Sequence, residues 1–320
     1  MPSALITGVT GQDGSYLAER LHADGWDVHA LVRASRDPQE QSVPEWVIPH
    51  VGDLLDAQSL TDAVAASAPD TIFNLAGITS VALSWNQPEL TARATALAVA
   101  TMLDAAWTLQ ESTGDPVRFV QATSAEMFGA ADHAPQDETT AVRPINPYGA
   151  AKAYAHHLVG VYRTRGLAAS SAILYNHESP RRPATFVTRK ITVGVAMIAR
   201  GLAPTLVLGN LDAERDWGWA PDYVDAMIRM AAAPNADDYV IATGQSHTVR
   251  DFVVAAFAAA GIADWEGYIE VDERYMRPSD APLLRGDSGK VRSALGWQPT
   301  RDFVEIVAAM VEHDLSLLGT

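Results

Sequence analysis

Short apolar runs alternate with amphipathic segments through the first half of the chain. The run 4–7 is typical of a buried strand, whereas 16–24 places Leu17, Ala18 and Leu21 at helical spacing. Strands that alternate with helices predict an α/β fold with a doubly wound parallel sheet, whose ligands bind at the carboxyl ends of the strands. The expected strands are 4–7, 28–32, 47–51, 71–75 and 118–121, and the expected helices are 16–24, 59–66, 90–109 and one that opens at Pro147.

Three glycines separate the first expected strand from the first expected helix. Glycine allows a tight turn and a close approach to a pyrophosphate, while the N–H groups and the dipole of a helix N-terminus favour an anion. A simple strand-to-helix turn is the alternative, but it does not explain three glycines within seven residues. The motif predicts a Rossmann dinucleotide site formed by Gly8, Thr10, Gly11, Gln12, Asp13 and Gly14.

Arg33 follows the second expected strand, where an NAD site usually carries an acidic residue that binds the ribose 2′-hydroxyl. Its planar guanidinium suits a 2′-phosphate, so we expect NADP rather than NAD as the cofactor. The alternative is that Arg33 and Arg36 are solvated surface charges.

Further cofactor contacts are expected where the next two strands end. Asp53 and Leu54 follow the third strand, and Asp53 either accepts from the adenine amino group or caps the next helix. Leu75 ends the fourth strand, and Ala76 and Gly77 are small enough to let the cofactor ribose pass closely.

Four side chains suited to acid–base chemistry follow the fifth expected strand. In an extended segment Ser124 and Glu126 project to the same side, at the carboxyl edge of the sheet. Tyr148 and Lys152 are four residues apart and share one helical face. A neighbouring ammonium stabilises a phenolate and lowers a pKa that is about 10 in free tyrosine. A surface tyrosine stacked on a lysine stem is the alternative, and the preceding dinucleotide unit favours catalysis.

Composition narrows the class of partner. The 320 residues are 48% hydrophobic and 19% charged, an ordinary globular mixture long enough for two domains. Acidic residues outnumber basic ones by 39 to 23, and the net charge of −16 argues against a surface for nucleic acid or anionic lipid. The absence of cysteine excludes disulfides and thiolate chemistry, and no histidine pair has metal-site spacing, so we expect no metal. The first residues lack a basic region ahead of an apolar run, so we expect no signal peptide and a cytoplasmic protein.

Longer strings carry a resemblance to a known family. The most distinctive are Asn176-His177-Glu178-Ser179-Pro180-Arg181-Arg182, Phe186-Val187-Thr188-Arg189-Lys190, Arg215-Asp216-Trp217-Gly218 and Arg274-Tyr275-Met276-Arg277-Pro278. With the glycine motif and Pro147-Tyr148-Gly149-Ala150-Ala151-Lys152, they extend almost from end to end of the chain. The chain resembles the extended short-chain dehydrogenases/reductases and, within them, the GDP-mannose 4,6-dehydratase family.

The resemblance implies a dehydration without net oxidation. Tyr148 would take the proton of the sugar 4-hydroxyl while hydride passes from C4 to NADP, with Ser124 holding the substrate oxygen. Glu126 would then remove the C5 proton and donate a proton to the 6-hydroxyl, which leaves as water before hydride returns to C6. Tyr148 and Lys152 would also contact the cofactor. A plain reductase or epimerase needs no acid at Glu126, which therefore favours a dehydratase.

The resemblance also implies a second, smaller domain. Residues 1–175 plus about 216–245 would bind NADP, and about 176–215 plus 246–320 would bind the nucleotide sugar. Asn176, Lys190, Arg215 and Arg277 would contact the substrate, with the arginines gripping the diphosphate, and the alternative for each is a surface ion pair. The cations among them, Lys190, Arg215 and Arg277, would form a basic cleft with Arg33 and Arg36 inside an acidic exterior. Among the histidines, His177 would shape its loop, whereas His156 and His157 would lie at the surface or an interface.

The chain departs from the family pattern at several positions. Ala125 replaces a hydroxyl in the catalytic turn, and Ile78-Thr79-Ser80 replaces Gln-Ser-His, which bears on the choice of sugar. Ala34 replaces a second arginine and the loop 34–45 is short; because this region reaches a neighbouring subunit in relatives, we expect a homodimer, with a homotetramer as the alternative. Another GDP-sugar such as a GDP-heptose, a 4-reductase or epimerase, and a non-catalytic NADP-sensing module are the alternative functions.

Overall fold

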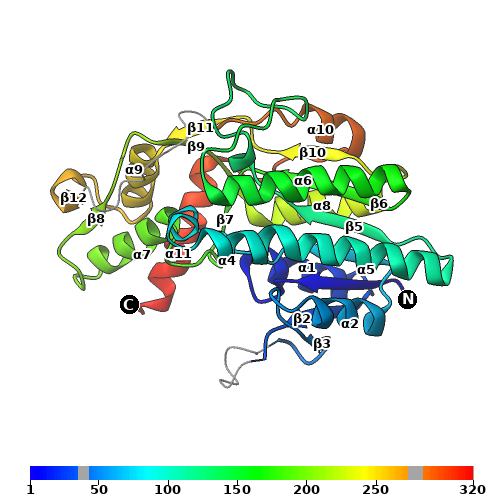
Figure 1. Ribbon diagram of the computed structural model, residues 1–320. Coiled ribbons are helices and arrows are strands. Elements are labelled where there is room, and N and C mark those ends of the chain that lie inside the picture. Colours follow the sequence, from blue (N-terminus) through cyan, green and yellow to red (C-terminus); the bar gives the residue numbers. More distant parts are fainter. Residues whose placement is uncertain (35–42, 273–283, 320) are drawn as a thin grey trace.

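The computed structural model, which describes residues 1–34, 43–272 and 284–319, contains a main sheet of parallel strands (Figure 1). The strand order is β10-β6-β5-β4-β1-β2-β3. The chain crosses from one half of the sheet to the other between β1 and β4, so this is the switch point where α/β sheets bind ligands. The expected doubly wound parallel sheet is confirmed. Its strands are β1 (Ser3–Thr7), β2 (Asp27–Val32), β3 (Val47–Val51), β4 (Thr71–Asn74), β5 (Arg118–Ala122), β6 (Ala168–Leu174) and β10 (Asp238–Ile241).

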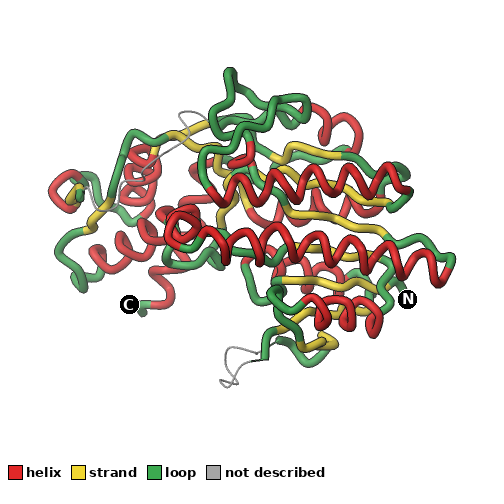
Figure 2. Tube along the Cα trace, in the orientation of Figure 1, coloured by secondary structure: helices red, strands yellow, loops and turns green. Residues whose placement is uncertain are grey.

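Helices cover both faces of the main sheet (Figures 1 and 2). On one face α2 (Ala57–Ser67), α5 (Ala98–Thr113) and α6 (Pro147–Arg165) enclose a core that includes Phe119. On the other face α1 (Gln12–Ala23), α8 (Ala220–Ala232) and α10 (Gly289–Leu295) enclose a core that includes Trp297. Burial on both faces explains why β1 is a continuous apolar run, whereas the edge strand β3 leaves most of its residues exposed.

The first helix begins earlier than its apolar pattern predicts. It starts at Gln12 rather than at Tyr16, so Gly14 lies in its first turn and not in the preceding loop. A Cβ on Gly14 would lie 2.1 Å from the Gly8 carbonyl oxygen. The third glycine of the motif is therefore required by close packing of the helix on the turn.

The long helix expected over 90–109 is three consecutive segments. α4 (Pro88–Ala92) follows α3 (Val81–Asn86), a π-helical segment (Arg93–Leu97) comes next, and α5 continues to Thr113. In the π-helical segment, Thr95 Oγ1 accepts a hydrogen bond from the Ile78 N–H at 3.0 Å. This contact anchors the loop that follows β4.

A second core lies beside the main sheet, in the part of Figure 1 that carries α7, α9 and α11. Trp217 and Phe252 belong to this core. Its strands form two small sheets, with the orders β11-β9-β7 and β12-β8. Its elements are β7 (Asn176–Glu178), α7 (Val187–Ala199), β8 (Leu206–Leu208), β9 (Glu214–Trp219), β11 (Ser246–Thr248), α9 (Val249–Ala259), β12 (Ile269–Val271) and α11 (Phe303–Leu317).

The chain returns to the main sheet through α8 and β10. We expected this return to begin at about residue 216, but β9 continues to Trp219 and pairs with β7 and β11. α10, from the last part of the chain, also packs against β10 and α8. Within the ranges the structure describes, no helix combines the length and apolar character needed to cross a membrane.

Candidate active site

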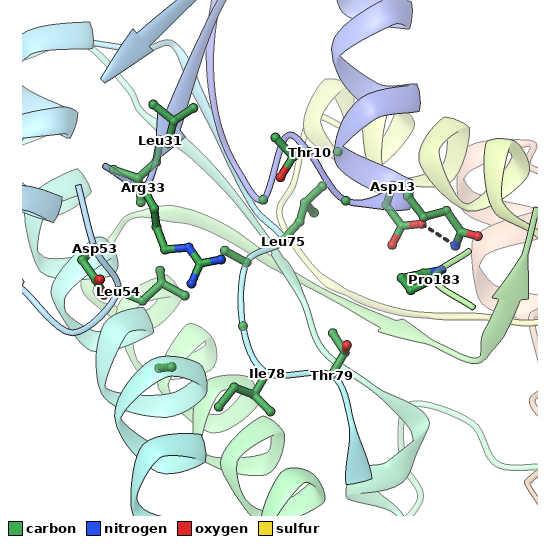
Figure 3. Close-up of a pocket in the computed structure, with 18 of the residues that line it drawn as sticks. Thr10, Asp13, Leu31, Arg33, Asp53, Leu54, Leu75, Ile78, Thr79 and Pro183 are labelled. Carbon is green, nitrogen blue, oxygen red and sulfur yellow. Dashed lines mark hydrogen bonds between the residues drawn. The ribbon is translucent and has the colours of Figure 1, made fainter. Parts of the chain in front are cut away.

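A cavity of about 1200 Å³ opens at the switch point of the main sheet (Figure 3). It exceeds the range of about 300–1,000 Å³ that is usual for ligand pockets, so a ligand as long as a dinucleotide has room in it. The glycine turn, the ends of β2, β3 and β4, and a segment of the second core form its wall. The lining residues are Gly8, Thr10, Gly11, Gln12, Asp13, Gly14, Leu31, Val32, Arg33, Ala34, Gly52, Asp53, Leu54, Leu55, Leu75, Ala76, Gly77, Ile78, Thr79, Leu90, Ala94, Arg182, Pro183 and Phe186.

The glycines of the turn allow its backbone to pack closely at this cavity. The Gly11 N–H donates to the Gly8 carbonyl at 3.0 Å, and Gly11 is the N-cap of α1. Gly8 has a φ of 77°, and a Cβ there would lie only 3.1 Å from the Ala76 nitrogen. These contacts bring the start of α1 close to the end of β4, an arrangement suited to an anionic group at the helix N-terminus.

Arg33 and Asp53 lie at one end of the cavity, and the Arg33 side chain extends toward its middle (Figure 3). Asp53 Oδ1 accepts from the Leu55 N–H at 2.8 Å, whereas the N-cap of α2 is Asp56. The helix-cap alternative for Asp53 is therefore wrong. Arg36 falls outside the described residues.

Asp13 lies at the other end, near Pro183 (Figure 3). Its Oδ2 is 2.9 Å from His177 Nε2, and His177 Nδ1 is 2.7 Å from the Tyr175 carbonyl oxygen. Burial acts to lower the pKa of His177, but the Asp13 carboxylate raises it above the ordinary value. Burial acts to raise the pKa of Asp13, yet His177 holds it below the ordinary value. The sequence marks both residues as parts of motifs but does not indicate that they meet.

Ser124 and Glu126 follow β5 in a turn, not in the extended segment that we expected. Ala125–Met127 forms a short 3₁₀ helix, and Ser124 caps it by accepting from the Glu126 N–H at 3.2 Å. The chain therefore bends between the two side chains. Asn146, which the sequence analysis did not single out, donates through Nδ2 to Glu126 Oε2 at 2.9 Å.

Tyr148 and Lys152 are both buried, with 8% and 4% of their surfaces exposed. Lys152 Nζ donates to the Ala122 carbonyl at 2.7 Å and lies 5.8 Å from the centre of the Tyr148 ring. Burial raises the pKa of Tyr148 to about 12, although a hydrogen bond with Ser124 acts in the opposite direction. Burial also lowers the pKa of Lys152 to about 8. The pKa of Tyr148 is thus raised rather than lowered in this structure, and burial is the largest cause.

Gly149 brings the start of α6 into contact with the Glu126 turn. A Cβ on Gly149 would lie 2.4 Å from the Glu126 carbonyl oxygen. The Asn146 side chain caps the same helix by accepting from the Gly149 N–H at 2.7 Å, and Pro147 occupies its first turn. The local sequence therefore positions Tyr148 directly beside the turn that carries Ser124 and Glu126.

The expected cofactor residues gather at the cavity more closely than the expected substrate residues do. The eleven from Gly8 to Ala76 line it, whereas Tyr148 and Lys152 are not part of its wall. Asn176, Lys190 and Arg215 are not part of the wall either, and Arg215 is 6% exposed with Nη1 donating to the Glu214 carbonyl. Arg277 falls outside the described residues.

The expected basic cleft is not seen in the described part of the wall. The charged residues there are Arg33 and Arg182 together with Asp13 and Asp53. The sequence analysis did not assign Arg182 a role, although the residue belongs to a distinctive string. Its guanidinium lies 3.8 Å from the Phe186 ring centre, and its Nε is 3.2 Å from Glu178.

Histidines away from this site have structural contacts. His156 Nδ1 is 3.0 Å from Ser171 Oγ, and His157 is exposed. Among the residues that the structure describes, no three potential metal ligands form a cluster.

The fold and site define the class of protein. A parallel sheet with a glycine turn at its switch point, together with a buried Tyr148 and Lys152 beside the end of β5, is the architecture of a short-chain dehydrogenase/reductase. The second core makes it an extended member of that class.

Comparisons with known proteins specify the family. The model of the family described as GDP-mannose 4,6 dehydratase matches residues 5–310. GDP-mannose 4,6 dehydratase 2 of Arabidopsis thaliana is 43% identical over 98% of this chain and 87% of its own length. The human GDP-mannose 4,6 dehydratase is 40% identical over 99% of this chain and 92% of its own length. The chain belongs to the GDP-mannose 4,6-dehydratase family, which confirms the resemblance found in the sequence.

Solved structures agree on the fold. UDP-glucose 4-epimerase of Thermus thermophilus, in complex with NAD, superposes with a TM-score of 0.85 at 26% identity and covers 98% of both chains. RMD from Pseudomonas aeruginosa, complexed with NADPH, superposes with a TM-score of 0.81 at 24% identity over 99% of this chain and 100% of its own.

Proposed function

We propose that the protein is a nucleotide-sugar 4,6-dehydratase that converts GDP-mannose into GDP-4-keto-6-deoxymannose and water. The family supports the substrate, and one observation supports the reaction. Gly149 holds the turn that carries Glu126 against the start of the helix that carries Tyr148. A tyrosine that exchanges a proton with a sugar hydroxyl and a carboxylate that removes a carbon-bound proton are what a dehydratase needs together.

The proposed cofactor is NADP. Its pyrophosphate would lie at the glycine turn, where Gly8 and Gly14 leave no room for side chains. Arg33 extends into the cavity and has the planar fork that binds a 2′-phosphate. When bound, the oxidised nicotinamide supplies a hydride acceptor and a positive charge that favours the phenolate of a neighbouring tyrosine. Leu75 and Ala76 lie between the two ends of the cavity and would pack on the cofactor.

The proposed catalytic residues have distinct roles. A pKa of about 12 keeps the proton on Tyr148 at neutral pH until the ligands lower that pKa. Tyr148 then accepts the proton of the sugar 4-hydroxyl, with Ser124 holding the same oxygen. Glu126 removes the C5 proton and protonates the departing 6-hydroxyl, which leaves as water. As C6 regains the hydride, Tyr148 returns its proton to C5, so that neither side chain keeps a proton at the end of the cycle. Lys152 positions the active-site end of α6 through its bond to the Ala122 carbonyl.

We further propose that the second core binds the nucleotide sugar. Asn176, Lys190 and Arg215 belong to elements of this part of the molecule, and Arg277 to the same stretch of the sequence. The proposed division is a cofactor-binding domain of residues 1–175 plus about 216–245, and a substrate-binding domain of about 176–215 plus 246–320. Two elements depart from this division. β9 pairs with β7 and β11 of the second core, and α10 packs against β10 and α8 of the main sheet.

The proposed assembly is a homodimer. Leu97, Tyr154 and Val161 are large side chains exposed by 54%, 44% and 59%, on the π-helical segment and the adjacent α6. Tyr154 and Val161 are seven residues apart and therefore lie on one face of α6. A second copy that presents the same face would bury these side chains, as a two-fold symmetric interface requires. We also propose a cytoplasmic location, with which a chain without cysteine is compatible.

Incubation of the purified protein with NADP and GDP-mannose, without added reductant, tests the proposal. We expect a 4-keto-6-deoxy product with no net consumption of the cofactor. Product from a GDP-heptose and none from GDP-mannose would overturn the substrate assignment and leave the mechanism standing. An epimer of the substrate would indicate an epimerase, and a requirement for added reductant a 4-reductase. Cofactor binding without turnover of any GDP-sugar would indicate an NADP-sensing module.

A further inference from the structure

Asn146 makes two hydrogen bonds with the two halves of its amide. The oxygen accepts from the Gly149 N–H at 2.7 Å and caps α6, while Nδ2 donates to Glu126 Oε2 at 2.9 Å. The residue is 5% exposed, so water does not readily replace either contact. One buried side chain therefore connects the helix that carries Tyr148 to the carboxylate of Glu126.

Helix capping alone does not require an amide at this position. Serine, threonine and aspartate cap helices about as well as asparagine, because only a side-chain acceptor is needed. None of them retains both an acceptor for the Gly149 N–H and an N–H donor directed at Glu126. The amide nitrogen of asparagine therefore adds the contact with Glu126, which capping alone does not need.

We propose that Asn146 is a positioning residue for the elimination step, which holds the Glu126 carboxylate in the orientation that removes the C5 proton. This inference rests on the proposed dehydratase function. A neutral donor to one carboxylate oxygen fixes the plane of the group without adding a competing acid. Because the same amide caps α6, the base and the tyrosine keep one relative position throughout the reaction.

The position of the Glu126 carboxylate also matters to the tyrosine. Its negative charge acts to raise the pKa of Tyr148, so a carboxylate that is held in place exerts a constant effect on the neighbouring phenol. The nearby Lys152 ammonium donates to the Ala122 carbonyl, which leaves it engaged in holding the backbone. The Asn146 amide, at the N-cap of the helix that carries Tyr148 and Lys152, is the group that donates to Glu126.

The decisive variant is Asn146→Asp, which has nearly the same shape and keeps the cap but replaces the donor with a carboxylate. Asn146→Ser also keeps the cap but does not reach Glu126. We expect both to lower kcat by about ten- to hundredfold with little change in KM, since a hydrogen bond to a charged group is lost from the elimination step. We expect reduced cofactor to accumulate during turnover, because C4 oxidation proceeds while its product waits for proton removal. The matched control is Asp302→Asn, the reverse exchange at the N-cap of α11 in the second core. It should change neither kcat nor the amount of reduced cofactor during turnover.

A spectroscopic readout separates this inference from the proposed function. In the protein without substrate, the side-chain amide resonances of Asn146 in a ¹H–¹⁵N spectrum should shift in Glu126→Ala. Resonances that do not move in that variant would overturn the inference whatever the substrate is. If both Asn146 variants kept the wild-type kcat and accumulated no reduced cofactor, the inference would also be overturned, because Asn146 would then serve only as a helix cap. A wild-type protein without activity on GDP-mannose, combined with the expected amide shift, would overturn the proposed function and leave the contact with Glu126 intact.

Discussion

Asp13 and His177 form an ion pair with 2.9 Å between Oδ2 and Nε2, although 164 residues separate them in the sequence. Asp13 belongs to the first turn of α1 and lines the cavity, while His177 lies in β7 of a small sheet. Gln12 strengthens the same connection by donating to the His177 carbonyl and accepting from Ser179. The glycine turn is therefore attached directly to the part of the chain that we propose binds the sugar.

His177→Gln should destabilise the protein by about 1–3 kcal/mol at pH 6, because it removes a charged hydrogen-bond partner of the half-buried Asp13 carboxylate. The pKa of His177 is raised on folding, so its contribution is fully present below the ordinary histidine pKa of about 6.5 and is lost as pH rises through the raised value. The pKa of Asp13 is lowered on folding, so its contribution is lost only as pH falls through that lowered value.

Urea midpoints of wild type and His177→Gln at several pH values measure this effect. The difference should be largest in mildly acidic buffer and should shrink in alkaline buffer. His157→Gln changes an exposed histidine and should leave the midpoint unchanged at every pH. A difference that grows with rising pH would contradict the ion-pair interpretation.

Glu126→Gln should slow the release of water by about a hundredfold or more, since general base catalysis is removed. Cofactor binding should be unaffected, because Glu126 is not part of the cavity wall. Product formation and cofactor titration in parallel separate the two effects. Full activity in this variant would refute the assigned role of the carboxylate.

Arg33→Ala should weaken NADP binding by about ten- to hundredfold and leave NAD binding almost unchanged, because the loss concerns only the 2′-phosphate. Titration calorimetry with NADP and with NAD measures the ratio of the two affinities in wild type and variant. Arg20→Ala removes an exposed arginine that pairs with Asp24 on α1, and it should change neither affinity. Tighter binding of NAD than of NADP by the wild type would contradict the argument from Arg33.

Gly149→Ala should abolish most activity, because its Cβ would meet the Glu126 carbonyl oxygen at 2.4 Å and force the two catalytic segments apart. Gly160→Ala lies on the same helix with no atom within 4 Å of the added Cβ and should stabilise the protein by up to about 1 kcal/mol. Thermal melting and kcat of both variants test this contrast. Equal activity in the two would show that the helix start tolerates displacement.

Val161→Glu should shift the protein from dimer to monomer, because a charge would be buried in the proposed interface on α6. Val304→Glu is the control, since Val304 is exposed to a similar extent, 62%, on α11. Sedimentation velocity distinguishes the two outcomes. A dimer that survives Val161→Glu unchanged would place the interface elsewhere.

The sequence predicted the parts of the fold that depend on local pattern. Apolar runs located strands β1 to β5 of the parallel sheet but not β6 and β10, and three glycines located the turn at the switch point. The π-helical segment was not predictable in this way, because its composition continues the apolar, alanine-rich pattern of an ordinary helix.

The candidate site shows the same limit. Motifs identified Glu126 and Tyr148 as candidates, but the contact of Asn146 with Glu126 spans 20 residues and depends on how two elements pack. The pKa of Tyr148 depends on burial, which the spacing of Tyr148 and Lys152 does not contain. Pairing across the fold, as in Asp13 and His177, leaves no periodic trace in the sequence.

The π-helical segment lets one continuous helix serve two separate surfaces. Leu90 in α4 and Ala94 in the π-helical segment line the cavity, whereas Met102 and Leu103 of α5 pack in the core under the main sheet. Each residue of an α-helix advances about 100° around the axis. The additional residue of the π-helical turn therefore rotates the side chains of α5 by that amount relative to those of α4. Substitution of Leu90, which lines the cavity and is not part of the core under the main sheet, would therefore reshape the binding wall without repacking α5, so that this position is open to changes in ligand preference.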